Sequence, residues 1–259
     1  MTSAVGSTQT TLPSIQIGIL TAGKPTLAMV LVSLIMQEEV PIDIYIVDTA
    51  QSPVIKRDDV VFAMRLAFDR GVRCGYEYSK ERGRAFSVGR LKLLQELKGP
   101  FVSFVDDDIV LPPRSFAALM DWSLKRESFG FVSPVCKNYG DTDNPLPGRP
   151  HYSPGGLIWQ DPIVRGILLE YYESTVDVLD ARGPSTRLWE KAFLSELFPS
   201  LGREAIVLEE CSSYHLDYKE RPLRHTIDER VVMASVTRAR EMASAALHIT
   251  PNGAVAAKD

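Results

Sequence analysis

Three consecutive carboxylates, Asp106, Asp107 and Asp108, directly follow the apolar run Phe101–Val105. Adjacent carboxylates raise one another's pKa, and an apolar interior cannot hold them ionised unless a cation neutralises them. Mg²⁺ and Mn²⁺ are commonly held by one or two carboxylates, with water and substrate phosphate oxygens as the other ligands. The segment therefore predicts a site for a divalent metal and a phosphate-bearing ligand. The alternative is an acidic turn that only caps the helix expected to follow.

Strands and helices alternate around this segment. Apolar, β-branched runs predict strands at residues 15–20, 42–47, 72–78, 101–105 and 131–135. Helical periodicity predicts helices at residues 26–37, 58–71, 85–97 and 113–126. The alternation predicts an α/β fold with a mostly parallel, Rossmann-like sheet flanked by helices. Ligands of such sheets bind beyond the carboxyl ends of the strands, so Thr21, Asp48 and the three aspartates should meet at one rim.

The pattern weakens after residue 135. Residues 137–161 are rich in Gly, Pro, Asn, Asp and Tyr and predict a long loop, which in a compact domain is usually functional. Further along we expect a strand at 175–179, a helix at 187–197, a strand at 223–227 and an amphipathic helix at 229–247. That last helix would cover the core, or alternatively contact a partner subunit in a homodimer or a membrane surface.

The domain organisation expected is one domain with two halves. A nucleotide-binding half would span residues 15–135, and a less regular acceptor half, ending in the last helix, residues 136–248. Residues 1–14 and 249–259 would be tails. Residues 1–14 have neither the basic nor the apolar region of a signal peptide, and no window is apolar enough to cross a bilayer.

Composition narrows the classes of function. The 259 residues are 45% hydrophobic and 24% charged, as is usual for a globular protein, and carry a net charge of -4. Without a basic surplus, a nucleic-acid partner is not expected. The three cysteines have no zinc-ligand spacing, and their odd, sparse set is typical of a reducing cytoplasm.

Four segments resemble, in the same order, motifs of the family 2 inverting glycosyltransferases. Residues 101–113 resemble the strand that ends in Asp-x-Asp and is followed by an apolar pair and Pro. Residues 17–21 resemble the first strand and its turn, and residues 44–52 the Val-Val-Asp-Asp-x-Ser segment. Residues 83–90 are similar to the helix start Gly-x-x-x-x-Ala-Arg-Asn, with Leu91 in place of Asn. The order of the four is more specific than any one of them.

This resemblance implies a GT-A-fold enzyme that uses Mn²⁺ or Mg²⁺ to move a sugar from a UDP or GDP sugar to an acceptor hydroxyl. The residues implied to contact the nucleotide are Thr21, Asp48, Arg82, Arg90, Asp106 and Asp107. Thr21 and Asp48 would face the base, and one of the two arginines the diphosphate. Asp108 and Asp106 would hold the metal, although three consecutive aspartates also allow Asp107 as the ligand.

Family 2 enzymes also have a carboxylate, typically at a helix start, that removes the acceptor proton. The pair Glu209-Glu210 resembles it, with Glu210 the first candidate for the base and Glu209 the second. The helix dipole alone also favours glutamates at a helix start. The family often has a late histidine near the metal, for which His215 and His225 are the candidates.

Other motifs in the sequence bear on alternative functions. Gly18 to Lys24 matches the phosphate loop Gly-x-x-x-x-Gly-Lys of NTPases, but Pro25 stands where that loop needs Ser or Thr for magnesium. No Gly-x-Gly-x-x-Gly follows the first strand, which argues against a dinucleotide oxidoreductase. A sugar nucleotidyltransferase and a non-catalytic sugar-nucleotide-binding protein remain alternatives.

Overall fold

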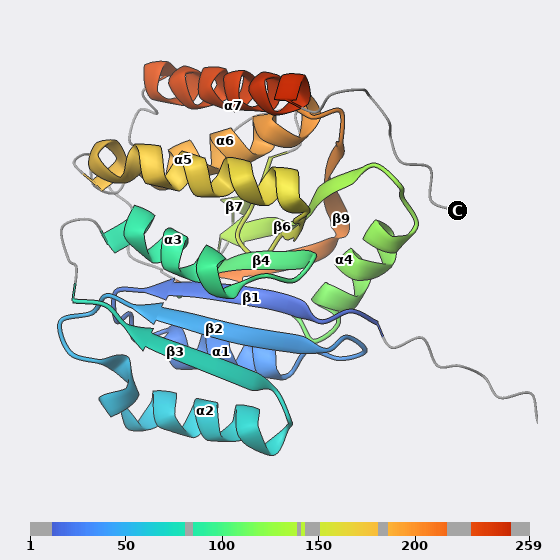
Figure 1. Ribbon diagram of the computed structural model, residues 1–259. Helices are drawn as coiled ribbons and strands as arrows, with labels where there is room; N and C mark the ends of the chain where they lie inside the picture. The colour runs from blue at the N-terminus through green and yellow to red at the C-terminus, as the bar shows by residue number, and fades with distance from the viewer. Residues whose placement is uncertain are drawn as a thin grey trace, which may run out of the picture.

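The computed structural model describes residues 12–80, 85–138, 141–142, 151–180, 186–216 and 229–249. The strands are β1 (Ile15–Thr21), β2 (Ile42–Asp48), β3 (Arg73–Tyr78), β4 (Phe101–Asp106), β5 (Ile109–Val110), β6 (Phe129–Asn138), β7 (Asp141–Thr142), β8 (Leu157–Trp159) and β9 (Glu204–His215). The helices are α1 (Leu27–Ile35), the 3₁₀ turn η1 (Val54–Lys56), α2 (Asp58–Asp69), α3 (Ala85–Glu96), α4 (Ser115–Leu124), α5 (Pro162–Asp180), α6 (Thr186–Ser200) and α7 (Glu229–Ile249). Figure 1 shows them around one central sheet.

The sheet has the order β3-β2-β1-β4-β8-β6-β9-β5, and β7 pairs with β6. Its first four strands are parallel, and their register sets Thr21 beside Asp48 and Leu20 beside Asp106. The carboxyl ends of β1, β2 and β4 therefore lie along one edge, as predicted. Beyond β4 the sheet is mixed, because β8 is antiparallel to both of its neighbours whereas β9 runs parallel to β6.

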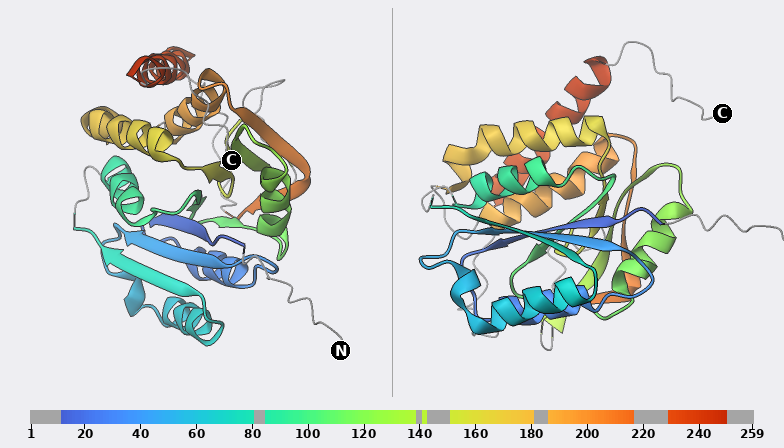
Figure 2. Two further views of the ribbon diagram at one scale, coloured as in Figure 1. Left: turned by 45° about the vertical axis from the view of Figure 1, so that its right-hand side comes forward. Right: turned by 60° about the horizontal axis from the view of Figure 1, so that its bottom comes forward.

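Helices cover both faces of the sheet (Figures 1 and 2). One hydrophobic cluster joins the sheet to α1, α2 and α4, and a second joins it to α3, α5 and α6. The residues of β1 alternate between these clusters, with Ile15, Ile17 and Ile19 in the first. Gly18 faces α3, where a Cβ atom would lie 2.8 Å from the Leu97 side chain. This close approach places α3, and with it Arg90, directly against the strands that end at the rim.

The predicted α/β alternation is confirmed up to residue 135, and the helix predicted at 187–197 is present as α6. The long loop predicted at 137–161 contains the short strands β7 and β8, and two further predictions are wrong. Residues 175–179 belong to α5 and form no strand. Their β-branched side chains favoured a strand, but the apolar residues of α5 recur at helical spacing and bury Val164, Leu168 and Tyr172 in the second cluster. Glu209 and Glu210 lie within β9 and do not begin a helix. The strand predicted at 223–227 falls outside the described residues.

Helix α7 covers the core, as the sequence predicted. Ala239, Met242 and Ala243 are buried in the second cluster, which also contains residues of α6. Within the described ranges, no helix combines the length and the apolarity needed to cross a bilayer. Cys74 and Cys211 are free thiols, and burial raises the pKa of the Cys74 thiol to about 11.

Candidate active site

Asp108 is the centre of the rim and has no exposed surface. Its Oδ2 atom forms an ion pair with the Lys24 ammonium and lies 3.4 Å from Nε2 of His215. Its Oδ1 atom is buried and has no hydrogen-bond partner among the described residues. A buried carboxylate oxygen without a partner is costly, so this atom is a candidate contact for a ligand.

Asp107 points to β1 instead. The Thr21 hydroxyl donates a 2.7 Å hydrogen bond to Asp107 Oδ2, and both side chains are buried. Burial raises the pKa of the Asp107 carboxyl; the bond from Thr21 opposes this rise and the neighbouring Asp108 adds to it. Asp107 therefore ties β4 to β1, and of the two aspartates Asp108 is the one with a buried oxygen that has no hydrogen-bond partner in the described part of the chain.

The turn after β1 carries Lys24 to this carboxylate. Gly23 has φ +91°, a left-handed conformation that favours glycine, and its N–H donates to the Thr21 hydroxyl at 3.0 Å. Arg57 donates a 2.7 Å hydrogen bond to the carbonyl of Lys24, and the Thr26 hydroxyl donates to the carbonyl of Asp107 at 2.8 Å. The backbone on both sides of the Lys24 side chain is therefore fixed.

Asp48, at the end of β2, is fully buried and organises the loop that follows it. Its carboxylate accepts hydrogen bonds from the Ala50 N–H at 2.8 Å, the Val54 N–H at 2.7 Å and the Tyr76 hydroxyl at 2.6 Å. Burial, together with the bond to Asp48, raises the pKa of the Tyr76 phenol. The predicted contact between Asp48 and a nucleotide base stays a prediction, and these three donors already engage both carboxylate oxygens.

Arg90 is buried beneath the rim, where it joins α3 to α6. Its guanidinium donates to both oxygens of Glu190, at 2.8 and 3.1 Å, and reaches Asp106 Oδ1 at 3.5 Å. It also lies over the Phe104 ring, 4.8 Å from the centroid. Burial alone would lower the pKa of Arg90, but the facing Glu190 carboxylate outweighs it and raises that pKa. With 2% of its surface exposed, Arg90 supports Asp106 from below.

Glu190 is a residue that the sequence analysis missed. It is 4% exposed and also accepts a hydrogen bond from the Tyr172 hydroxyl. The signal available in the sequence was an acidic residue on the apolar side of a predicted helix, three residues before the buried Phe193. An ionised group on a buried helix face is costly unless it is paired, so its position alone indicated a partner.

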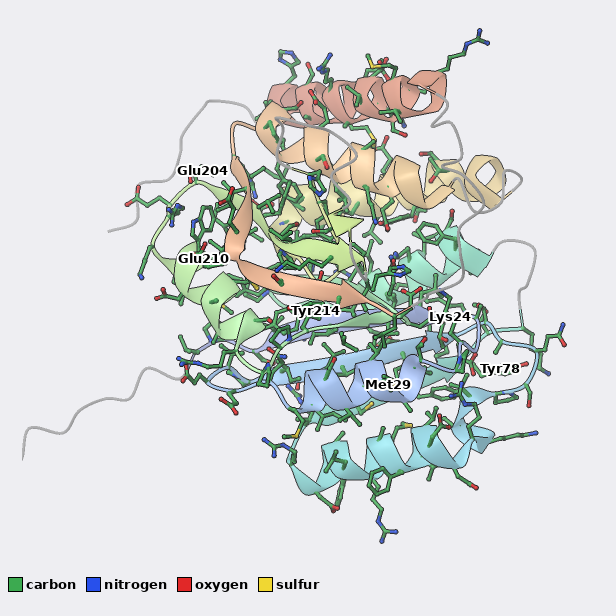
Figure 3. The ribbon with its side chains drawn as sticks, turned by 180° about the vertical axis from the view of Figure 1, so that it is seen from behind. Lys24, Met29, Tyr78, Glu204, Glu210 and Tyr214 are labelled. Atoms are coloured by element: carbon green, nitrogen blue, oxygen red, sulfur yellow. The ribbon has the colours of Figure 1, made fainter. Side chains whose placement is uncertain are left out.

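His215 is brought to the rim by the last residues of β9. The pairing of β5 with β9 sets Ile109 beside His215, and the Leu216 N–H donates to the carbonyl of Asp108 at 2.8 Å. Figure 3 shows β9 running from Glu204 past Glu210 to Tyr214, with its end directed toward Lys24. Of the two candidate histidines, His215 is therefore the one placed beside the carboxylates; His225 lies outside the described residues.

Glu209 and Glu210 are not brought to this rim. Both side chains are exposed, and they lie where the register between β6 and β9 shifts, between the pairs Pro134–Leu208 and Val135–Ser212. Glu210 is five residues before His215, roughly 16 Å along a strand. That Glu210, or Glu209, acts as the base stays a prediction. The position of the two residues on β9 argues against it. Arg82 lies outside the described residues.

The NTPase alternative loses its main support here. Gly18 is a strand residue packed against α3, and it does not begin a loop. Lys24 contacts the Asp108 carboxylate from the short connection between β1 and α1. A phosphate loop would instead wrap its backbone N–H groups around the phosphates over the whole segment.

Solved structures share this architecture, although no protein-family model and no curated protein sequence matches the chain. A structure of Staphylococcus aureus TarS (residues 1–349) in complex with UDP-GlcNAc aligns with a TM-score of 0.55 and 13% identity, over 91% of this chain and 72% of that one. The mannosyltransferase PcManGT of Pyrobaculum calidifontis, in complex with GDP-Man and Mn²⁺, aligns with a TM-score of 0.54 and 16% identity, over 96% and 77%. GalNAc-T7 with UDP, GalNAc and Mn²⁺ has a TM-score of 0.54 and 12% identity, over 79% and 44%.

The fold is that of the GT-A glycosyltransferases. This confirms the fold class expected from the sequence. The chain spans 36% of the length of a longer TarS chain and 60% of its 1–349 fragment in other alignments. At these identities the likeness concerns the fold, so the activity must be argued from the site itself.

Proposed function

We propose that this chain is a metal-dependent, inverting glycosyltransferase of the family 2 type. It would transfer a sugar from a UDP or GDP sugar to an acceptor hydroxyl. The observation that carries the proposal is the buried Asp108 at the carboxyl end of the central strands, with one oxygen unpartnered among the described residues and the other facing Lys24 and His215. The complexes of neighbouring folds with UDP-GlcNAc, or with GDP-Man and Mn²⁺, support the donor class.

The residues at the rim fit a divalent ion. Carboxylate oxygen suits Mg²⁺ and Mn²⁺, and a neutral imidazole is a common metal ligand. In the part of the chain that the structure describes, no three His, Cys, Asp or Glu side chains form a complete metal site. Asp108 and His215 meet at the rim and would supply the protein ligands, and Asp106 would lie beside them. Phosphate and water oxygens would complete the coordination shell.

Each rim residue would then have a distinct role in transfer. The ion, when bound, would offset charge on the departing diphosphate. Lys24 would add a second positive charge from the turn, while Thr21 and Asp48 would hold the loops that border the nucleotide. The acceptor oxygen would form its bond to the anomeric carbon as the bond to the phosphate oxygen breaks, and a carboxylate base would take the acceptor proton. Sequence resemblance supplies Glu210 as the base candidate, but its exposed position on β9, roughly 16 Å along the strand from His215, argues against that role.

A thermal-shift panel of UDP, GDP, dTDP and ADP sugars, with and without Mn²⁺, tests the donor class. A ligand at 100 times its Kd stabilises the folded state by about 2.7 kcal/mol, so the correct nucleotide should raise Tm clearly and only with the metal. No shift with any donor in the presence of Mn²⁺ would contradict the proposal.

Analysis of the products separates the alternatives. A glycosyltransferase releases a nucleoside diphosphate, and the anomeric configuration of the product, read by NMR, reports inversion. A nucleotidyltransferase given a sugar phosphate and a nucleoside triphosphate would release pyrophosphate. Donor binding with neither transfer nor donor hydrolysis would point to a non-catalytic binding protein.

A further inference from the structure

The position of Lys24 suggests a role that the metal site alone does not explain. Lys24 forms an ion pair with Asp108, whose side chain is 0% exposed, whereas the Lys24 side chain is 27% exposed. The Lys24 side chain therefore borders solvent and the Asp108 carboxylate does not. An ion that approaches Asp108 Oδ2 meets a position already taken by a positive charge.

We propose that Lys24 is an exchangeable cation, which neutralises Asp108 before the donor arrives and moves to the donor diphosphate when the metal takes Asp108. The inference rests on the proposed function. An unpaired carboxylate at a fully buried position is strongly destabilising, so the ion-free protein needs this partner. A diphosphate offers the ammonium a second anion within the same rim.

The turn is built for movement of the side chain alone. Hydrogen bonds from Arg57 to the carbonyl of Lys24, and from Gly23 to Thr21, hold the backbone. The ammonium itself is carried by a flexible four-carbon stem with rotatable donors. Metal exchange therefore requires new side-chain rotamers at Lys24 and no refolding of the turn.

The exchange makes metal and nucleotide binding cooperative. Without nucleotide, Mn²⁺ must either displace the Lys24 ammonium from Asp108 Oδ2 or bind Oδ1 beside that positive charge, and both weaken its affinity. With nucleotide, the diphosphate holds the displaced ammonium and lowers that cost. Because coupling between two ligands is reciprocal, Mn²⁺ should tighten UDP or GDP by the same factor by which the nucleotide tightens Mn²⁺.

The experiment measures Mn²⁺ affinity by electron paramagnetic resonance, with and without UDP or GDP, in the wild type and in Lys24→Met. We expect Lys24→Met to bind Mn²⁺ alone at least about fivefold more tightly, and the nucleotide to tighten Mn²⁺ by a smaller factor than in the wild type. Without metal, the Tm of Lys24→Met should fall, and Mn²⁺ should raise it by more than it raises the wild-type Tm.

Lys92→Met is the matched control. Lys92 is 26% exposed and forms an ion pair with Glu77, so the variant removes a lysine of similar exposure and its ion pair, away from Asp108. It should leave Mn²⁺ affinity unchanged. Lys24→Gln, which keeps a polar group beside Asp108, replaces Lys24→Met if that variant does not fold.

Two failures are distinguishable. If Mn²⁺ binds the wild type and both Lys24 variants equally, and Asp108→Ala abolishes that binding, the exchange is overturned and the glycosyltransferase proposal stands. If the wild type and Lys24→Met bind no Mn²⁺ with either nucleotide, the metal-dependent function is overturned, and the exchange with it.

Discussion

Asp48 and Asp108 occupy similar places and are satisfied in opposite ways. Each is a fully buried carboxylate at the carboxyl end of a parallel strand, Asp48 on β2 and Asp108 just beyond β4. Asp48 accepts three hydrogen bonds from neutral groups that belong to the fold itself. Asp108 faces a lysine on a flexible stem and a histidine, and its second oxygen has no partner within the described chain.

The difference separates a structural carboxylate from one available to a ligand. Neutral donors that belong to the fold, here two backbone N–H groups and the Tyr76 hydroxyl, cannot be exchanged without disturbing the loop that follows β2. A charge on a mobile side chain is exchangeable, and an unpartnered buried oxygen gains from any ligand that reaches it. Substituting a carboxylate with fixed partners should therefore reduce stability. Substituting a carboxylate with exchangeable partners should reduce binding and turnover.

The largest expected effect is that of Asp108→Ala. Transfer should fall by about 1,000-fold, equivalent to about 4 kcal/mol of transition-state stabilisation, because the metal loses its central ligand. Nucleotide binding should also lose its dependence on Mn²⁺, as measured by calorimetry. Asp43→Ala, which removes the exposed pair with Arg73 on the same sheet, is the control and should retain transfer. Unchanged turnover in Asp108→Ala would mean that Asp108, like Asp48, has only a structural role.

Glu190→Gln tests a second carboxylate with fixed partners. Among the described residues, the change leaves Asp106 as the one carboxylate paired with the buried Arg90 charge, so the free energy of unfolding should fall by about 3 kcal/mol in urea denaturation. Glu77→Gln is the control, since its pair with Lys92 is partly exposed and should contribute about 0.5 kcal/mol. Equal losses in the two variants would mean that the buried pair has no special weight.

Asp48→Asn should reduce stability more than nucleotide binding. The amide cannot accept from all three donors, and a buried donor that loses its partner costs about 2 kcal/mol. Tyr76→Phe removes one of these donors together with its bond, and should cost about 1 kcal/mol. A variant Asp48→Asn with wild-type stability and weakened UDP or GDP binding would instead assign Asp48 to the nucleotide site.

Asp107→Asn should have a small effect that depends on pH. Because burial raises the pKa of the folded carboxyl, Asp107 contributes stability below the pKa of the unfolded chain and loses it as pH rises through the folded value. Asparagine does not titrate, so at pH 7 without metal the variant should be more stable than the wild type by about 0.5 kcal/mol. The gain should vanish near pH 3 in thermal unfolding. Loss of Mn²⁺ binding in this variant would make Asp107 the metal ligand.

The first half of this fold was predictable from the sequence because its rules are local. Apolar runs ending at Thr21, Asp48 and Asp106 identified three strands, and the rule for parallel sheets placed their ends at one rim. The ion pairs that distinguish the rim residues were not predictable. Lys24 and Asp108 are separated by 84 positions, and Arg90 and Glu190 by 100, and no periodicity encodes such contacts.

The prediction for the second half of the chain missed β9 for a similar reason. Residues 204–215 mix apolar, acidic and small side chains without strict alternation, since the strand is partly exposed and its pairing with β6 shifts register near Glu210. The acidic pair then favoured a helix start. For the same reason the sequence could not choose between the candidates His215 and His225, because it is the pairing of β9 with β5 that brings His215 to Asp108.

Glu210→Gln should have the smallest effect of these variants. Its carboxylate is exposed and lies roughly 16 Å along the strand from His215, too far to take a proton from an acceptor held beside the diphosphate. Turnover should therefore change by less than about twofold, or about 0.4 kcal/mol, in steady-state transfer assays. Glu209→Gln is the neighbouring control and should behave alike. A large drop in turnover with normal donor affinity in Glu210→Gln alone would restore Glu210 as the base. In that case the part of β9 around Glu210 would have to move to the rim when the acceptor binds.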